Sequence, residues 1–240
     1  MRCSHHDMLL KNANFVWWAV GGLGAVALGV SLFFVDGILA YHVSAACLTY
    51  LFFLGCVGFN IGAGVLATRS AVGDAEDTGP RRYRVSCLAA CAVSCCDVGL
   101  LFSAETLVTG AWWGHIAWGV SWIWEPRLTG MFLMTLCFMS WRLACAILGA
   151  EMVSKGRLTA CLILLGLPSM AFTHVASQLF GGIHPATVEQ SGAIFPASGW
   201  MVDVVLGHLL AGLACAGAIV RRKMKNRGGD SSHAHAKTMC

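Results

Sequence analysis

Long apolar stretches alternate with short polar or glycine-rich connections along the 240 residues of the chain. A helix needs about 20 mostly apolar residues to cross the hydrocarbon core of a bilayer. Backbone polar groups in lipid must bond within their own segment, so each stretch is expected to be helical. The pattern predicts an all-α integral membrane protein with six transmembrane helices, at residues 15–35, 43–67, 86–108, 129–149, 158–177 and 198–220.

The positions of the basic residues predict which way the chain crosses the membrane. All 16 lysines and arginines except Arg127 fall on one side of the six predicted spans, with Arg142 towards that side of span four. Because cytoplasmic segments carry an excess of lysine and arginine, both termini are expected to be cytoplasmic. The chain divides into a cytoplasmic N-terminal segment (1–14), a six-helix membrane domain (15–220) and a basic, disordered cytoplasmic tail (221–240).

The composition agrees with a membrane protein that has no separate soluble domain. Hydrophobic residues make up 57% of the chain and charged residues only 12%, against about 25% charged residues in soluble domains. The chain has twelve cysteines but no C-x-x-C motif, and nine of the cysteines lie in or at the ends of apolar stretches. We therefore interpret these cysteines as small hydrophobic residues rather than as a disulfide framework or a redox site.

The second outer connection, residues 109–128, contains five of the nine tryptophans: Trp112, Trp113, Trp118, Trp122 and Trp124. An interfacial aromatic belt explains one or two tryptophans at a helix end, and we assign Trp112 and Trp113 to such a belt. The others are interleaved with glycines and followed by Glu125 and Arg127. Indole rings suit a large planar apolar ligand, and an arginine offers paired donors to a carboxylate. A porphyrin with propionates needs both features.

Two histidines are expected on the same outer face. His42 stands at the outer start of span two, and His184 lies in the third outer connection, before Pro185. Either histidine alone fits a polar residue at the interface, but histidine is also a common axial ligand of haem iron. Together with the tryptophans, the two histidines predict a haem site with His42 and His184 as axial ligands. His115 and His174 are expected to be structural.

The segment from Trp118 to Thr129, W-G-V-S-W-I-W-E-P-R-L-T, resembles the tryptophan-rich "WWD" signature of haem-handling proteins. Its nearest likeness is to the CcmC family, haem exporter protein C, whose pattern is about W-G-T-W-W-V-W-D-A-R-L-T. The histidine in Tyr41-His42-Val43 and His184 before Pro185 are similar to the two histidines of that family. The sequence departs from the family at Ser121, Glu125 and Pro126.

The resemblance implies a role in cytochrome c maturation, without enzymatic activity. Haem b would be held non-covalently at the outer face by His42 and His184 and delivered to the haem chaperone CcmE. Trp118, Trp122 and Trp124 would form an apolar platform, Arg127 would meet a propionate, and Glu125 would orient Arg127 or the chaperone's reactive group.

The resemblance also implies partners and a location. The ABC-transporter-like subunits CcmA and CcmB and the small membrane protein CcmD would assemble with this chain, and no nucleic acid would bind. The chain has no G-x-x-x-x-G-K-[ST] phosphate-binding loop, so any ATPase would be a partner. The expected location is the bacterial inner membrane, and the mitochondrial inner membrane also fits.

Several alternatives remain open from the sequence. The chain is a haem exporter subunit if it moves haem across the bilayer itself, although a transporter should show a polar path or an internal repeat. The haem lyases CcmF and CcsA share the tryptophan-rich motif but are larger, and a quinone-binding or respiratory subunit would not need this outer-face set.

Two acidic residues fall in span three. Asp97 is deep in the span and is expected either to pair with His208 or Arg142 or to serve a proton or substrate pathway. Glu105 lies near the outer end of the span and is expected to reach the interface. Gly58 and Gly62 have the G-x-x-x-G spacing, which is a weak signal of close helix packing.

Overall fold

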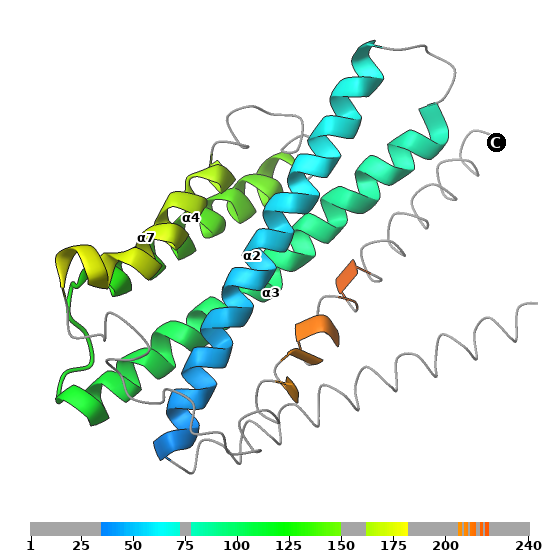
Figure 1. Ribbon diagram of the computed structural model, residues 1–240. Coiled ribbons are helices and arrows are strands. Elements are labelled where there is room, and N and C mark those ends of the chain that lie inside the picture. The colour runs from blue at the N-terminus through cyan, green and yellow to red at the C-terminus, as the bar shows by residue number, and fades with distance from the viewer. Residues whose placement is uncertain are drawn as a thin grey trace, which may run out of the picture.

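A computed structural model describes residues 35–72, 78–149 and 162–181, together with helical residues at 206–207, 209–210, 212–214, 217 and 219–220. Within these ranges all regular structure is helical (Figure 1). The helices, labelled as in Figure 1, are α2 (Val35–Val72), α3 (Thr78–Trp118), α4 (Pro126–Leu148) and α7 (Gly166–Phe180). The predicted all-α class is confirmed for this part of the chain.

Three of these helices are long and apolar enough to cross a membrane, with spanning stretches at Tyr41–Thr68, Tyr83–Trp118 and Pro126–Leu148. They correspond to predicted spans two, three and four. Span five is matched by a shorter apolar helix, Leu162–Thr173, which α7 continues. Span one up to residue 34 lies outside the described residues, as do parts of spans five and six, so the six-span count and the orientation stay predictions.

Helices α2 and α3 are longer than their predicted spans. They contain 38 and 41 residues, which corresponds to about 57 and 62 Å at 1.5 Å per residue. The hydrocarbon core of a bilayer is only about 30 Å thick. The two helices run antiparallel side by side, while α4 and α7 pack together against one side of the pair (Figure 1).

One aromatic stack joins the four helices. Phe53 of α2 and Phe138 of α4 are fully buried, with ring centroids 3.7 Å apart and ring planes within 3°. Gly99 of α3 lies against Phe53, where an added Cβ would come 2.6 Å from the ring, and Gly166 of α7 lies against Phe138 at 2.7 Å. Since real Cβ atoms do not approach so closely, the two glycines are required by the stack.

Buried side chains extend this centre along the helices. The surrounding core includes Cys56 and Val57 of α2, Ala92 and Cys96 of α3, and Met134 and Trp141 of α4. A second cluster of α2 and α3 residues contains Phe52 and Phe102, and Gly212 approaches these two rings so closely that a Cβ would lie 2.8 Å from each. Part of predicted span six therefore packs against the α2–α3 pair.

The G-x-x-x-G spacing at Gly58 and Gly62 does not mark a close helix contact among the described residues. A Cβ on Gly58 would meet nothing within 4 Å, and a Cβ on Gly62 would make only an ordinary contact with Leu88. The close contacts instead fall at glycines without that spacing. The eight described cysteines, at positions 47, 56, 87, 91, 95, 96, 137 and 145, are free thiols, which agrees with their interpretation as small hydrophobic residues.

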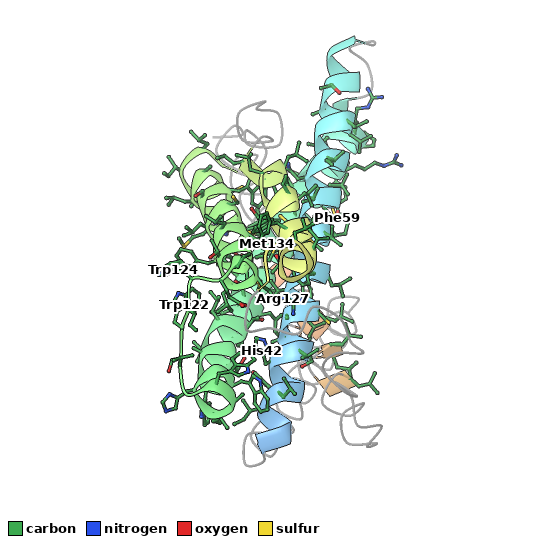
Figure 2. All side chains as sticks on the ribbon, turned by 60° about the vertical axis from the view of Figure 1, so that its left-hand side comes forward. His42, Phe59, Trp122, Trp124, Arg127 and Met134 are labelled. Atoms are coloured by element: carbon green, nitrogen blue, oxygen red, sulfur yellow. The ribbon has the colours of Figure 1, made fainter. Side chains whose placement is uncertain are left out.

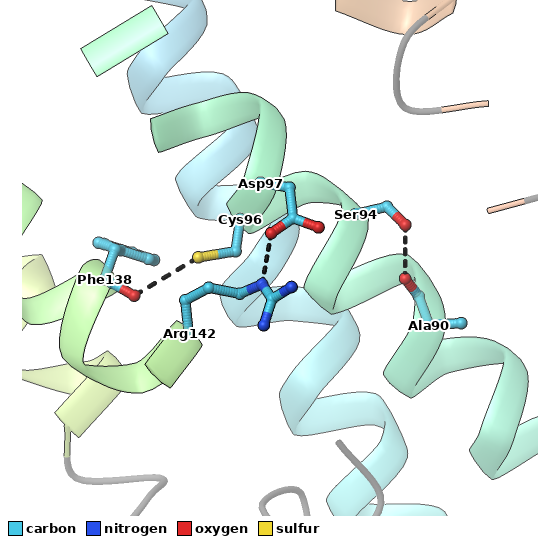
Figure 3. Close-up of polar contacts among 6 residues, drawn as sticks. All are labelled: Ala90, Ser94, Cys96, Asp97, Phe138 and Arg142. Atoms are coloured by element: carbon cyan, nitrogen blue, oxygen red, sulfur yellow. Dashed lines mark hydrogen bonds and ion pairs between the residues drawn. The ribbon is translucent and has the colours of Figure 1, made fainter. Parts of the chain in front are cut away.

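Polar contacts connect α3 to α4 within the membrane region (Figure 3). The Nε of Arg142 donates to the carboxylate of Asp97 in an ion pair, and the thiol of Cys96 lies 3.5 Å from the carbonyl oxygen of Phe138. The Ser103 and Thr135 hydroxyls also hydrogen bond. Of the two partners proposed for Asp97, the structure confirms Arg142, whereas His208 lies outside the described residues.

Replacing Gly99 or Gly166 by alanine should force the aromatic stack apart. We expect each variant to lose about 1–3 kcal/mol of unfolding free energy, the range typical of overpacked cores. Gly58→Ala is the matched control, because its methyl group enters open space in a helix that alanine favours. Thermal unfolding in detergent measures the difference, and equal stability of all three variants would show that the stack does not constrain the helices.

Breaking the ion pair should destabilise the protein more than removing both charges. Arg142→Ala leaves Asp97 without its partner in the membrane, so we expect a loss somewhat below the about 3–5 kcal/mol of a fully buried pair. The loss is smaller because the two side chains keep 32% and 25% exposure. The double variant Asp97→Asn, Arg142→Gln should recover most of the unfolding temperature; a double variant as unstable as Arg142→Ala would contradict this role.

Candidate functional site

The tryptophan-rich segment is half helix and half connection. Residues 109–118, which we predicted as part of an outer loop, continue α3 to Trp118, so the predicted end of the helix at residue 108 is wrong. A helix satisfies its own backbone hydrogen bonds, and the segment contains no proline before Pro126 to interrupt it. The helix ends at Gly119, which has φ of 74° and donates its N–H to the carbonyl of His115 at 3.0 Å, as in the αL type of helix end.

Beyond Gly119 the chain folds back along α3. The carbonyl oxygen of Val120 lies so near Gly114 that a Cβ there would come within 3.0 Å of it. The chain then enters α4 with Glu125 as the N-cap residue and Pro126 in the first turn, a position that proline favours because its φ already fits the helix. The departure at Pro126 is therefore explained by the start of α4.

Trp122, Trp124 and Phe132 form an aromatic ridge at this connection. Their ring centroids are 5.4, 5.9 and 6.3 Å apart, and the rings meet edge to face at 77–82°. The ridge is therefore not one flat platform. Trp124 keeps 68% of its surface exposed. The ring of Trp118 lies close to Gly114, where an added Cβ would come 3.5 Å from it. The exposed indole of Trp124 offers the largest apolar surface of the ridge.

His42 lies inside α2, which begins at Val35, and at the start of its membrane-spanning stretch Tyr41–Thr68, as predicted. Its Nδ1 is 3.0 Å from the carbonyl oxygen of Thr106 and 3.3 Å from the hydroxyl oxygen of Thr109. The ring rests on Gly110, where a Cβ would come 2.7 Å from Cε1. A carbonyl only accepts hydrogen bonds, so Nδ1 carries the hydrogen, and in the neutral ring the lone pair is on Nε2.

Sequence reasoning missed the neighbouring contact between Tyr41 and Glu105. The Tyr41 side chain is only 3% exposed, and its hydroxyl donates to the Glu105 carboxylate. Glu105 therefore does not simply reach the interface as expected. Their positions near the same end of two neighbouring predicted spans allow such a pair, but the sequence does not fix which faces of the two helices meet.

Arg127 points into the bundle from the first turn of α4. Its Nε donates to the carbonyl oxygen of Thr173 in α7 at 3.3 Å, and Tyr50 of α2 hydrogen bonds with the Thr173 side chain. Glu125, two residues before Arg127, is buried with 5% exposure. Arg127 therefore lies where α2, α4 and α7 meet.

The structure brings some of the candidate residues together and separates others. Trp122 and Trp124 lie at one edge of the molecule, whereas His42 and Arg127 lie further in (Figure 2). His184 lies outside the described residues, and so does the side chain of His174. His115 is exposed on the last turn of α3. No three histidine, cysteine, aspartate or glutamate side chains of the described residues are placed to hold a bare metal ion.

Gly119 should control how the ridge is placed. Gly119→Val puts a β-branched residue at φ of 74°, which costs about 1–2 kcal/mol for an L-residue, while Asn tolerates this region much better. Open space surrounds the position, so strain of the backbone is the cause. We expect Gly119→Val to lower the unfolding temperature and shift tryptophan fluorescence, and Gly119→Asn to change both less; equal effects would argue against the turn.

Comparison with known proteins places this chain in a family. Residues 81–233, more than half of the chain, match the family model described as CcmC, Heme exporter protein C. The chain is 39% identical over 61 residues to a heme exporter protein C of Rhodobacter capsulatus, covering 25% of this chain and 24% of that protein.

Two further relatives come from distant organisms. A heme exporter protein C of Escherichia coli is 26% identical over 102 residues, 42% of this chain and 40% of the relative. A CcmC-like mitochondrial protein of cytochrome c biosynthesis from Arabidopsis thaliana is 32% identical over 83 residues, 32% of this chain and 28% of the relative. These alignments span between about a quarter and two fifths of each relative. The extent of the family match shows that the chain belongs to the CcmC family.

Proposed function

We propose that this protein handles haem during cytochrome c maturation, holding it at the outer face of the membrane and delivering it to a haem chaperone. Family membership and the names of its relatives support haem as the cargo. The observation that carries the proposal is the placement of His42. Its ring is held by Thr106 and Thr109 in the tautomer whose Nε2 has a lone pair for iron.

The second axial ligand in this proposal is His184, which lies outside the described residues. Histidine on both sides of the iron binds haem b without a covalent bond to the protein. A histidine whose Nδ1–H is held by a backbone carbonyl keeps its ring orientation fixed, which is a common arrangement for metal-bound histidine. The orientation of His42 therefore suits a haem held by coordination of its iron.

Arg127 and the tryptophans supply the remaining contacts. Arg127, like His42, lies further into the bundle than the tryptophans (Figure 2). It is the proposed partner of a haem propionate, to which a guanidinium donates paired hydrogen bonds. Glu125, which is buried and lies two residues before Arg127 in the chain, is the proposed orienting residue. Trp118, Trp122 and Trp124 provide apolar contacts, and the exposure of Trp124 suits contact with the haem edge or with the chaperone.

The proposed partners follow from the family. The cargo would pass to the chaperone CcmE, and the chain would assemble with CcmA, CcmB and CcmD in the bacterial or mitochondrial inner membrane. The sequence contains no phosphate-binding loop of the G-x-x-x-x-G-K-[ST] type, so CcmA would provide ATP hydrolysis. In this proposal the chain itself catalyses no covalent reaction.

The absorption spectrum of the purified protein tests the site. We expect His42→Ala to lose most of the bound haem and its Soret band, and His184→Ala to shift or weaken the band, because each removes an axial ligand. His115→Ala is the matched control, since His115 is an exposed histidine on the same end of α3. An unchanged spectrum and haem content in both ligand variants would contradict the assignment.

Transfer then separates delivery from export. Mixing the haem-loaded protein with purified CcmE should move haem to the chaperone, and the His42→Ala variant should transfer little. If haem instead crosses the bilayer of proteoliposomes without CcmE, the protein is an exporter subunit rather than a delivery protein.

A further inference from the structure

Two neighbouring residues of α2 meet two neighbouring residues of α3 at the outer end of the bundle. Tyr41 donates its hydroxyl to the carboxylate of Glu105. His42, the next residue, directs Nδ1 at the carbonyl oxygen of Thr106, the residue after Glu105. A tyrosine–carboxylate contact and a histidine–carbonyl contact thus lie side by side between the same two helices.

The Nδ1 partner of a metal-bound histidine tunes how strongly the other nitrogen binds. A carboxylate partner draws the Nδ1 hydrogen towards itself and makes Nε2 a stronger donor to the metal, whereas a neutral carbonyl does so much less. His42 uses neutral partners, the Thr106 carbonyl and the Thr109 hydroxyl. The hydroxyl of Thr109 donates to the backbone carbonyl of Glu105 at 2.6 Å, so its oxygen is left to accept from His42.

A carboxylate nevertheless stands next to these neutral partners. Glu105 precedes Thr106 in α3, and its Oε2 atom is buried without a hydrogen-bond partner among the described residues. The contact with Tyr41 is the hydrogen bond that the described structure gives this side chain. Without the Tyr41 hydroxyl, the half-buried Glu105 carboxylate would need another donor. The Nδ1–H of His42 is a candidate, because His42 follows Tyr41 and contacts the Thr109 hydroxyl, which donates to the Glu105 backbone.

Gly110 makes room for the imidazole ring of His42 against α3. A Cβ at this position would come 2.7 Å from Cε1 and 3.1 Å from Nδ1 of His42. The ring therefore lies against the backbone of α3, where it faces the Thr106 carbonyl. The glycine explains why the histidine can approach a backbone acceptor so closely.

We infer that Tyr41 is a positioning residue that holds the Glu105 carboxylate away from His42, so that His42 remains a weakly donating ligand from which haem is readily released. This inference rests on the proposed function, in which His42 binds the haem iron. A carrier that passes its cargo on needs a ligand bond that breaks during transfer. Because Tyr41 binds the Glu105 carboxylate, His42 keeps its neutral hydrogen-bond partners and remains such a ligand.

Variants of the full-length protein, purified in detergent and loaded with haem, test the inference. Tyr41→Phe removes one hydroxyl, and we expect haem loss to an excess of apomyoglobin to become about tenfold slower, the lower end of typical effects of such outer partners on metal affinity. The haem reduction potential should fall, because a stronger histidine donor favours the oxidised iron. A role confined to folding would move neither quantity.

Two control variants isolate the carboxylate. The double variant Tyr41→Phe, Glu105→Gln should return to the wild-type rate and potential, because the amide cannot act as the carboxylate does. Tyr41→Gln keeps a hydrogen-bond donor for Glu105 and should also stay close to wild type. If Tyr41→Phe does not fold, Tyr41→Leu replaces it as the variant without a hydroxyl, and Tyr41→Gln remains the comparison that keeps a donor.

The outcomes separate the inference from the proposed function. If His42→Ala loses haem while the donor-free variants at Tyr41 keep the wild-type rate and potential, the inference is overturned and the haem site stands. If His42→Ala keeps haem with a wild-type spectrum, the proposed ligand itself is wrong. Slower release in Tyr41→Phe that Glu105→Gln reverses supports both.

Discussion

The bundle depends on the close approach of four helices around Phe53 and Phe138. Their rings stack at 3.7 Å, and Gly99 and Gly166 bring α3 and α7 against the stack. Lipid tails are as apolar as the side chains, so burial of apolar surface does not drive helices together in a membrane as it does in water. Close packing at small residues and interhelical polar contacts must do this instead. The stack provides the first and the contacts of Asp97 and Ser103 provide the second.

This packing fixes the geometry at the end of the bundle that carries His42. Once α2 and α3 are in register, His42 faces the carbonyl of Thr106 and rests on Gly110. Once α4 and α7 are in place, Arg127 reaches the carbonyl of Thr173. His42 and Arg127 are thus carried by helices and not by loops, which holds side chains more precisely. The aromatic ridge combines Trp122 and Trp124 of the connection between α3 and α4 with Phe132 of α4, and its two tryptophans lie apart from His42 (Figure 2).

The sequence predicted features that depend on hydropathy and on charge. It predicted the all-α class, the spans matched by α2, α3 and α4, and Arg142 as one of two partners for Asp97. It did not predict the helical stretch 109–118, because glycines and tryptophans at an interface suggest a loop and the helix simply continues. Nor did it predict the edge-to-face ridge or the Tyr41–Glu105 contact. Both depend on how helices rotate about their axes, and a hydropathy pattern does not fix that rotation within a mostly apolar span.

The same reasoning explains why the predicted constellation was only partly assembled. Placing two histidines and five tryptophans on one side of a membrane sets their depth, but not which helix face each occupies. In the structure Trp122 and Trp124 lie at the edge of the bundle, and His42 and Arg127 lie further in (Figure 2). A planar ligand bound by His42 would therefore have its iron ligand inside the bundle. The tryptophans of the aromatic ridge would remain available to contact the edge of the ligand or a partner protein.

Cavity complementation at His42 tests the central claim most directly. His42→Gly removes the imidazole and leaves a space of its size beside the Thr106 carbonyl. If His42 supplies the nitrogen that binds haem iron, the variant should lose the Soret band of the wild-type protein, and added imidazole should restore its position and intensity. A His42→Gly variant that keeps the wild-type band without imidazole, or that imidazole fails to restore although the protein is folded, would contradict the account.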